Sequence, residues 1–383
     1  MATNSLLLKY CIKDSLETFD PYDIWKIKLG EITKRFYNFN KFLGIIPAII
    51  LTCFDFFINN KLRLFYKKQE YPVVRAFAAM SLLNQYKCEI NENLLLNIEK
   101  HLDWLKNNYS KGYSGYCWGI NFIHVVSNKV NYPKDQPFST ITPYVLEAFL
   151  NYKEITNDNC YDDVIHKIFL FFENDIKIIE ETEDYLITSY GTFKDRIVIN
   201  AISYTLYSYS LFLNIYKDKD GYIKNKIIKL YNYIRENQKE NGSWLYSPEG
   251  DSFIDCFHSC FILKNLIKAS AFIDLKEVDV VIEKGYGYIQ ENFYNIKYGL
   301  YKRFTKSNKP SIIKFDLYDN AEMLNLLLLL NKYDLALELK NNIEKVFIKG
   351  EDIYSVIDLF GNKKNKNTLR WAVMPYLYSI SKM

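Results

Sequence analysis

The sequence has few of the short motifs that mark a disulfide framework, a metal centre or a nucleotide-binding loop. Its seven cysteines include no C-x-x-C pair and their number is odd, which argues against a disulfide scaffold and fits reduced thiols in a cytoplasmic protein. An H-E-x-x-H zinc motif, a G-x-G-x-x-G or G-K-[ST] phosphate loop and a nucleophile elbow are all missing. We therefore expect neither a cofactor nor a bound metal ion.

An excess of charge of one sign is also lacking. The 49 Lys and Arg residues nearly balance the 45 Asp and Glu residues, so the formal charge is +4, and the two signs are interspersed. This distribution is typical of solvated helix faces and excludes the concentrated basic surface of a nucleic-acid-binding protein. The first residues lack the basic start and the small-residue cleavage site of a signal peptide, so we expect a cytoplasmic location.

Long apolar runs are limited to one stretch, residues 42–58, which is apolar enough to suggest contact with a membrane. Pro47 and Asp55 interrupt it, and it is shorter than the roughly 20 residues that span a bilayer. We expect a buried helix here, within a group of N-terminal helices (residues 1–70) that pack on the main domain or complete it. The alternative is a peripheral membrane contact through residues 42–58.

From residue 72 onward, apolar residues recur with helical spacing. The expected helices cover residues 73–86, 92–108, 141–152, 161–178, 196–216, 221–237, 253–271, 275–292, 317–331, 333–347 and 368–381. Links of a few residues alternate with long connections, at residues 109–140, 179–195, 238–252, 293–316 and 348–367. This alternation predicts an all-α fold, an α/α toroid of five to six helical hairpins over residues 71–383, with its long loops on one face. An open helical solenoid has the same local pattern, but the last helix lacks a polar outer face and needs a partner.

Polar side chains recur where the long loops lead into the inner helices of such a ring, and they should meet at its mouth. Asp255 and His258 are three residues apart and share one helical face, where a carboxylate can orient an imidazole for proton transfer near neutral pH. Asp316 and Asp319 form a second pair at the next helix start. We expect these four residues to be catalytic. Helix starts favour Asp as a cap regardless of function, which is the alternative for Asp316, whereas Asp255, His258 and Asp319 lie past the expected cap positions.

Further residues at the same mouth are expected to bind substrate. They are Asn200, Arg370 with Trp371, and the loop aromatics Tyr116, Trp118 and Trp244. Arg370, like Arg196, would hold an anionic group by a bidentate contact, unless a neighbouring Asp pairs with it. The aromatic rings would stack on sugar rings, although Trp118 could instead plug a turn.

The block Gln238-x-x-x-Gly242-Ser243-Trp244 resembles the Q-W repeat of squalene cyclases and related prenyltransferase-like toroids. A closer resemblance is to α/α-toroid (six-hairpin) proteins encoded among bacterial surface-polysaccharide genes. The matching blocks keep the same order along the chain: Asp20-Pro-Tyr-Asp23, Gly115-Tyr-Cys-Trp-Gly119, Asn200-Ala201, Asn241-Gly-Ser-Trp244, Ile254-Asp-Cys-Phe-His258 and Leu369-Arg-Trp371. The chain departs from that pattern at Asp319, where a His is expected, so His258 is the only imidazole among the matching helix starts.

The resemblance implies a role in surface-polysaccharide or glycoconjugate biosynthesis, and similar toroids include uronyl epimerases, unsaturated-glycoside hydrolases and polysaccharide lyases. We expect an enzyme of the epimerase, lyase or hydrolase type that performs acid/base chemistry on a sugar, a nucleotide-sugar or a lipid-linked oligosaccharide. The alternatives are a non-catalytic toroid that acts as a scaffold or binds glycans, and a terpene-cyclase-like isoprenoid enzyme, which the absence of a D-x-D-D motif disfavours. An enzyme predicts a deep polar pocket with Asp255, His258 and Asp319 within hydrogen-bond reach of one another, whereas a scaffold predicts a filled centre.

Overall fold

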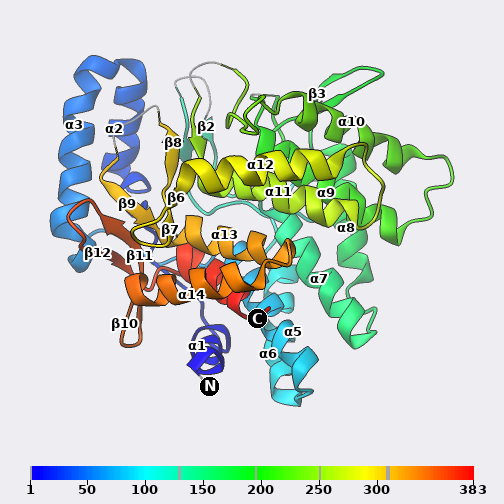
Figure 1. Cartoon of the computed structure of the whole chain (residues 1–383), viewed down its shortest axis with the longest axis horizontal. Coiled ribbons are helices and arrows are strands. Elements are labelled where there is room, and N and C mark those ends of the chain that lie inside the picture. Colours follow the sequence, from blue (N-terminus) through cyan, green and yellow to red (C-terminus); the bar gives the residue numbers. More distant parts are fainter. Residues whose placement is uncertain (1, 128–130, 195, 250–251, 308–310) are drawn as a thin grey trace.

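A closed ring of helices forms the body of the protein, whose computed structural model describes residues 2–127, 131–194, 196–249, 252–307 and 311–383 (Figure 1). The inner helices of the described chain are α5 (Pro72–Cys88), α7 (Thr142–Thr156), α9 (Ile199–Ile215), α11 (Cys256–Ser270), α13 (Leu317–Leu329) and α15 (Met374–Ile380). Consecutive members pack against one another, and α15 packs against α5. The prediction of an α/α toroid is therefore confirmed over the open solenoid.

The inner helices are buried around almost their whole circumference. In α9, every residue from Ile199 to Phe212 is buried. A helix without an exposed face needs neighbours on all sides, and a closed ring surrounded by a second layer provides them.

Amphipathic helices form this second layer. They are α6 (Glu92–Asn107), α8 (Asp162–Asn174), α10 (Tyr222–Glu236), α12 (Val278–Phe293) and α14 (Tyr333–Phe347). In α10, for example, buried residues from Ile223 to Ile234 recur every three or four positions and form one stripe against α9. The N-terminal helix α1 (Ala2–Cys11) packs against α5 and α15 and so takes the remaining outer position.

Short strands occupy the long connections, which the sequence analysis treated only as loops. In the largest sheet, β11 (Asp352–Asp358) pairs antiparallel with β9 (Ile313–Asp316), β10 (Ile348–Lys349) and β12 (Lys363–Lys366). The remaining pairs are β1 (His124–Val125) with β2 (Asn131–Tyr132), β3 (Ile178–Glu181) with β4 (Leu186–Thr188), β5 (Ile254–Asp255) with β8 (Phe304–Lys306), and β6 (Tyr294–Asn295) with β7 (Leu300–Tyr301). Strands β5 and β9 run directly into α11 and α13, so strand pairing fixes where these inner helices begin.

The apolar N-terminal stretch forms a helical hairpin outside the ring. Helices α2 (Lys28–Phe39) and α3 (Lys41–Cys53) pack together, and the π-helix η2 (Phe54–Asn59) and α4 (Asn60–Leu62) continue α3. The prediction of a buried helix is wrong, because α2 covers only one face of α3 and leaves Phe42 85% exposed. The continuous helix Lys41–Leu62 has 22 residues, so it is also longer than predicted and, by length and composition alone, could cross a membrane.

Candidate active site

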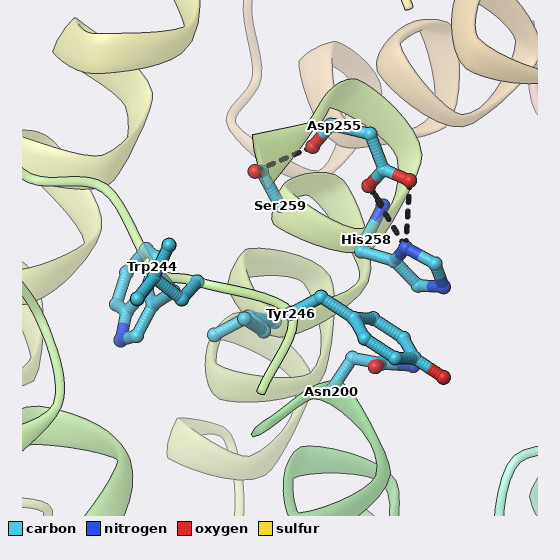
Figure 2. Close-up of a pocket in the computed structure, with 8 residues that line it drawn as sticks. Asn200, Trp244, Tyr246, Asp255, His258 and Ser259 are labelled. Carbon is cyan, nitrogen blue, oxygen red and sulfur yellow. Dashed lines mark hydrogen bonds and ion pairs between the residues drawn. The ribbon is translucent and has the colours of Figure 1, made fainter. Parts of the chain in front are cut away.

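The Asp255 carboxylate and the His258 imidazole form a hydrogen-bonded pair at the start of α11 (Figure 2). The imidazole Nδ1 lies 2.8 Å from both carboxylate oxygens. Because an ionised carboxylate only accepts hydrogen bonds, Nδ1 is the nitrogen that carries a proton toward Asp255, and Nε2 is the nitrogen left for proton transfer. In Figure 2 this second nitrogen points away from Asp255.

Asp255 also caps the helix, contrary to the expectation that it lies past the cap. Strand β5 ends at Asp255 and α11 begins at Cys256, so the carboxylate accepts a hydrogen bond from the His258 backbone N–H. The Asp255 side chain is buried, whereas that of His258 is 19% exposed. The pair therefore has a buried acid and an imidazole that a bound molecule can reach.

A pocket of about 210 Å³, which includes space open to solvent, lies beside this pair (Figure 2). Its lining residues are Asn200, Trp244, Leu245, Tyr246, Asp255, His258, Ser259 and Ile262. Asn200, in the first turn of α9, is buried, and its side-chain oxygen has no hydrogen-bond partner in the described chain. Because a buried unpaired polar atom costs about 1–3 kcal/mol, we interpret Asn200 as a contact point for a ligand.

A guanidinium held by tyrosine rings lies next to the pocket. The Arg196 guanidinium is 4.3 Å from the centre of the Tyr190 ring and 5.8 Å from that of Tyr246, which itself packs against His258 at 4.7 Å between ring centres. Its Nε donates a hydrogen bond of 3.0 Å to the Tyr132 hydroxyl. Among the described residues Arg196 forms no ion pair, and the adjacent Asp195 lies outside them. Of the two arginines considered in the sequence, this one is available to an anion.

Asp316 and Asp319 lie behind the pocket rather than along its wall. Asp316 caps α13 through the Tyr318 backbone N–H and accepts a hydrogen bond of 2.7 Å from Arg303 Nη1. Asp319 accepts a hydrogen bond of 3.0 Å from the Phe257 backbone N–H, and its other oxygen is buried without a partner among the described residues. Burial raises the pKa of both carboxyls. Asp319 thus holds the first turn of α11 in place, next to His258.

Arg370 is occupied by a buried ion pair that joins the two ends of the chain. Its Nε lies 2.5 Å from an Asp20 carboxylate oxygen, just before the short helix η1 (Asp23–Trp25). Burial alone would raise the pKa of Asp20, but Arg370 and Lys26 hold it well below its usual range. Arg370 lies in the π-helix η3 (Leu369–Val373) that leads into α15, so this contact closes the ring and leaves no free guanidinium for a substrate.

Trp371, also in η3, belongs to an aromatic cluster beside the start of α11. Its ring stacks on Tyr318 at 4.6 Å and meets the edge of Phe257 at 5.6 Å. It is absent from the pocket lining, and it supports the pocket through Phe257, the neighbour of His258.

The other predicted aromatic contacts have structural partners. The indole of Trp118 is fully buried and donates to the Leu105 carbonyl at 3.1 Å, as expected of a plug, and Trp244 donates to the Ile234 carbonyl at 2.9 Å. Each accepting carbonyl lies two residues before the end of an outer helix, and the Leu105 carbonyl also accepts the Asn108 backbone N–H at 3.2 Å. Trp244 additionally forms part of the pocket wall, whereas Tyr116 stacks on Tyr109 at 3.9 Å, outside the pocket lining.

Two residues of the site escaped the sequence analysis. Tyr246 lies in an irregular loop, where its position two residues after Trp244 was the only available signal. Arg303 follows a two-residue strand and pairs with Asp316 across the end of β9. Within the described residues, no three His, Cys, Asp or Glu side chains are grouped so that they could hold a metal ion.

Comparisons with known proteins bear on the fold. No family model matches the chain, and no curated protein matches its sequence. Among solved structures, a sugar epimerase from a ruminal bacterium has a TM-score of 0.61 at 14% identity over 82% of this chain and 86% of that chain. A cellobiose 2-epimerase from Bacillus thermoamylovorans has a TM-score of 0.63 at 12% identity, covering 89% and 99%, and a GH76 alpha-mannanase from Bacteroides thetaiotaomicron 0.58 at 12%, covering 95% and 98%. These likenesses show the shared α/α toroid.

Proposed function

We propose that the protein is a carbohydrate-active enzyme of surface-polysaccharide or glycoconjugate biosynthesis that moves a proton at a carbon atom of a sugar. The observation that carries this proposal is the Asp255–His258 pair, because its free imidazole nitrogen borders a polar pocket at an inner-helix start. A base oriented by a carboxylate suits proton abstraction next to a carbonyl or carboxyl group. Two of the similar solved structures are named as sugar epimerases, which favours the same reaction class.

Epimerase, isomerase or lyase chemistry fits this site better than glycoside hydrolysis. Hydrolysis ordinarily requires two carboxyl groups that flank the scissile bond. Of the described residues that line the pocket, Asp255 alone carries a carboxylate, and it is bound to His258. The ionisable lining also disfavours an isoprenoid substrate.

Arg196 favours a negatively charged substrate. Its guanidinium contacts tyrosine rings and has no carboxylate partner among the residues that the structure describes, and it lies one ring away from His258. A uronic acid, a nucleotide-sugar and a lipid-linked oligosaccharide all offer an anionic group that such a guanidinium can bind. In this proposal Arg196 takes the anion-binding role that the sequence analysis assigned to Arg370.

The test is proton exchange with solvent. The purified protein is incubated in D2O with a panel of neutral sugars, uronic acids and nucleotide-sugars, and NMR detects a sugar C–H signal that is replaced by deuterium. We expect exchange with at least one anionic sugar, its loss in His258→Gln, and its retention in His166→Gln, because His166 is exposed on the outer helix α8. Equal exchange by His258→Gln and the wild type would refute the proposal.

A non-catalytic glycan-binding module is the second candidate. The centre of the ring is filled, since the buried Tyr144 and Tyr204 hydroxyls bond to each other and the buried Lys264 pairs with Glu322. The pocket is therefore shallow rather than deep. Binding of a sugar by the wild type, detected by calorimetry without any exchange across the panel, would favour this candidate.

A further inference from the structure

We propose that the α2–α3 hairpin is a docking surface for an anionic lipid bilayer. We use the name docking hairpin for residues 28–62, which stand at the left edge of Figure 1 and contact β12. Membrane docking goes beyond the proposed function, and it does not depend on whether the protein is an enzyme or a non-catalytic glycan-binding module.

Each arm of the docking hairpin carries an apolar stripe that the rest of the described chain leaves exposed. The exposed apolar residues are Leu29, Ile32, Phe36 and Phe39 on α2, and Phe42, Leu43, Ile45, Ile46, Ile49, Ile50, Phe57 and Ile58 from α3 to η2. The α2 residues are three or four positions apart, and Phe42, Ile45, Ile46, Ile49 and Ile50 follow the i, i+3, i+4, i+7, i+8 pattern, so each arm has an apolar helical face. At the turn between the arms, Phe39 is 80% exposed and Phe42 is 85% exposed, so the tip presents two aromatic rings.

The inner faces of the docking hairpin already have partners. Gly44 is buried so close to the Tyr37 backbone that an added methyl group would lie 2.4 Å from the Tyr37 Cα. Further along, the Lys364 ammonium donates to the Phe56 carbonyl at 3.2 Å, and the Asn60 amide donates to Asn365 at 2.8 Å. The hairpin is therefore fixed to the body through β12, and its exposed stripes are not an incomplete core.

The charge of this segment is complementary to anionic lipid. The docking hairpin has five basic and two acidic residues, and three more basic residues, Arg63, Lys67 and Lys68, follow it, although the whole chain has a formal charge of only +4. Glu31 is paired with Arg35 at 2.9 Å, and Asp55 is buried against the Tyr66 hydroxyl. An apolar helical surface with basic residues beside it is the pattern of interfacial membrane binding, since the apolar face enters the lipid and the cations attract acidic head groups.

A bilayer suits this surface better than a second copy of the chain. Two copies joined through their hairpins would bring the same excess of positive charge together, which is unfavourable. Helices satisfy their own backbone hydrogen bonds, so the tip can enter the lipid without exposing unpaired polar groups. Lys41, which lies between Phe39 and Phe42, can extend its ammonium back to the head groups.

The docking hairpin adjoins the pocket side of the ring. Helix α2 packs against β1, where His124 stacks on Tyr132 with 6.1 Å between ring centres. Tyr132 in turn accepts the hydrogen bond from Arg196. A protein bound through this hairpin would hold its pocket near the lipid surface, where, if the proposed function holds, a lipid-linked substrate would be presented.

Vesicle flotation tests the proposal without reference to catalysis. The full chain is mixed with vesicles of phosphatidylcholine and phosphatidylglycerol, or of phosphatidylcholine alone. We expect flotation with the anionic vesicles, weaker flotation with the neutral ones, and release at high salt. The triple variant Phe39→Ser/Phe42→Ser/Ile46→Ser should partition at least about tenfold more weakly, because three exposed apolar side chains no longer enter the lipid.

The matched control is Ile90→Ser/Ile296→Ser, which removes two residues of the ring that are 83% and 88% exposed and should leave flotation unchanged. Thermal melts of both variants confirm that they fold. Absence of flotation by the wild type, or equal flotation by the triple variant, overturns the proposal. The proposal is also overturned if light scattering shows a wild-type dimer that the triple substitution abolishes and the wild type does not float with vesicles.

Discussion

Asp255 has two separable roles, since its carboxylate both caps α11 and orients His258. Asp255→Asn keeps a good cap but removes the charge that stabilises an imidazolium, so we expect exchange activity to fall roughly 10²–10⁴-fold with little change in stability. Asp255→Ala should lose the same activity and also about 1 kcal/mol of unfolding free energy. Exchange rates and urea titrations of both variants measure the two roles. Undiminished exchange by Asp255→Asn would show that the carboxylate is not the orienting group.

Arg196 should make the protein bind negatively charged sugars more tightly than neutral ones. In Arg196→Gln we expect the affinity for an anionic sugar to fall about tenfold or more, because a charge-assisted hydrogen bond is lost, while a neutral analogue binds as before. Calorimetric titration with a uronic acid and with the corresponding neutral sugar makes the comparison. Arg35→Gln, on the exposed part of α2, is the matched control. Equal losses for both sugars would point to a structural role.

At the residue scale, the sequence predicted that Asp255 and His258 lie side by side. They do so because the side chain of a cap residue meets the first turn of its helix, where His258 is the third residue of α11. Tyr246 could not be found, since it reaches His258 from an irregular loop. Whether an arginine is free or paired was also beyond the sequence, because the Asp20 partner of Arg370 lies at the other end of the chain.

At the scale of elements, Trp118 and Trp244 have the same role, since each indole donates a hydrogen bond to a carbonyl near the end of an outer helix. Trp244→Phe leaves the buried Ile234 carbonyl without its indole donor and should lower the unfolding free energy by about 1–3 kcal/mol, whereas Trp118→Phe should cost less, because the Leu105 carbonyl keeps the Asn108 backbone N–H. Urea denaturation measures the change. Trp104→Phe, in the half-buried part of α6, serves as the control and should cost less. Matching values for all three variants would mean that the indole hydrogen bonds contribute little.

The sequence predicted neither the strands nor the exposure of the docking hairpin. All the described strands except the seven-residue β11 have two to four residues, which is too short for an alternating pattern, and the pairs β5–β8 and β9–β11 join different connections of the ring. The apolar run at residues 42–58 did predict a helix, but periodicity cannot tell a helix buried in a core from one that leaves an apolar face outside.

The whole molecule depends on the N-terminal helix α1, which completes the outer layer of the ring, and His101 of α6 binds this helix. Its Nε2 donates to the Cys11 carbonyl of α1 at 2.6 Å, and its Nδ1 accepts from Arg75 of α5 at 3.0 Å. Burial lowers the pKa of His101 to about 4. Between about pH 4 and 6.5 the unfolded chain therefore binds more protons than the folded one at this residue.

Because of His101, the unfolding free energy should rise by about 3 kcal/mol as the pH increases across this window. This contribution is complete above about pH 6.5. Urea titrations at several pH values measure the slope. His101→Gln should reduce it, while His166→Gln, at an exposed position, should not. An unchanged slope in His101→Gln would exclude His101 as the source.

The closed ring itself was predictable because its signal is distributed over the chain. Short and long connections alternate through five hairpins, and the last helix has no face that tolerates solvent, so closure was the consistent arrangement. The depth of the pocket was not predictable, since it depends on how large side chains such as Tyr144 and Tyr204 fill the centre.

The central claim is that a sugar binds at the mouth of the ring against His258. A crystal structure with an exchanging sugar bound tests it most directly. We predict that the exchanging carbon faces His258 Nε2 at a distance suited to proton transfer, that Asn200 bonds a hydroxyl group, and that Arg196 contacts the anionic group. A sugar bound elsewhere on the molecule, or in this pocket with the imidazole unengaged, would contradict the account.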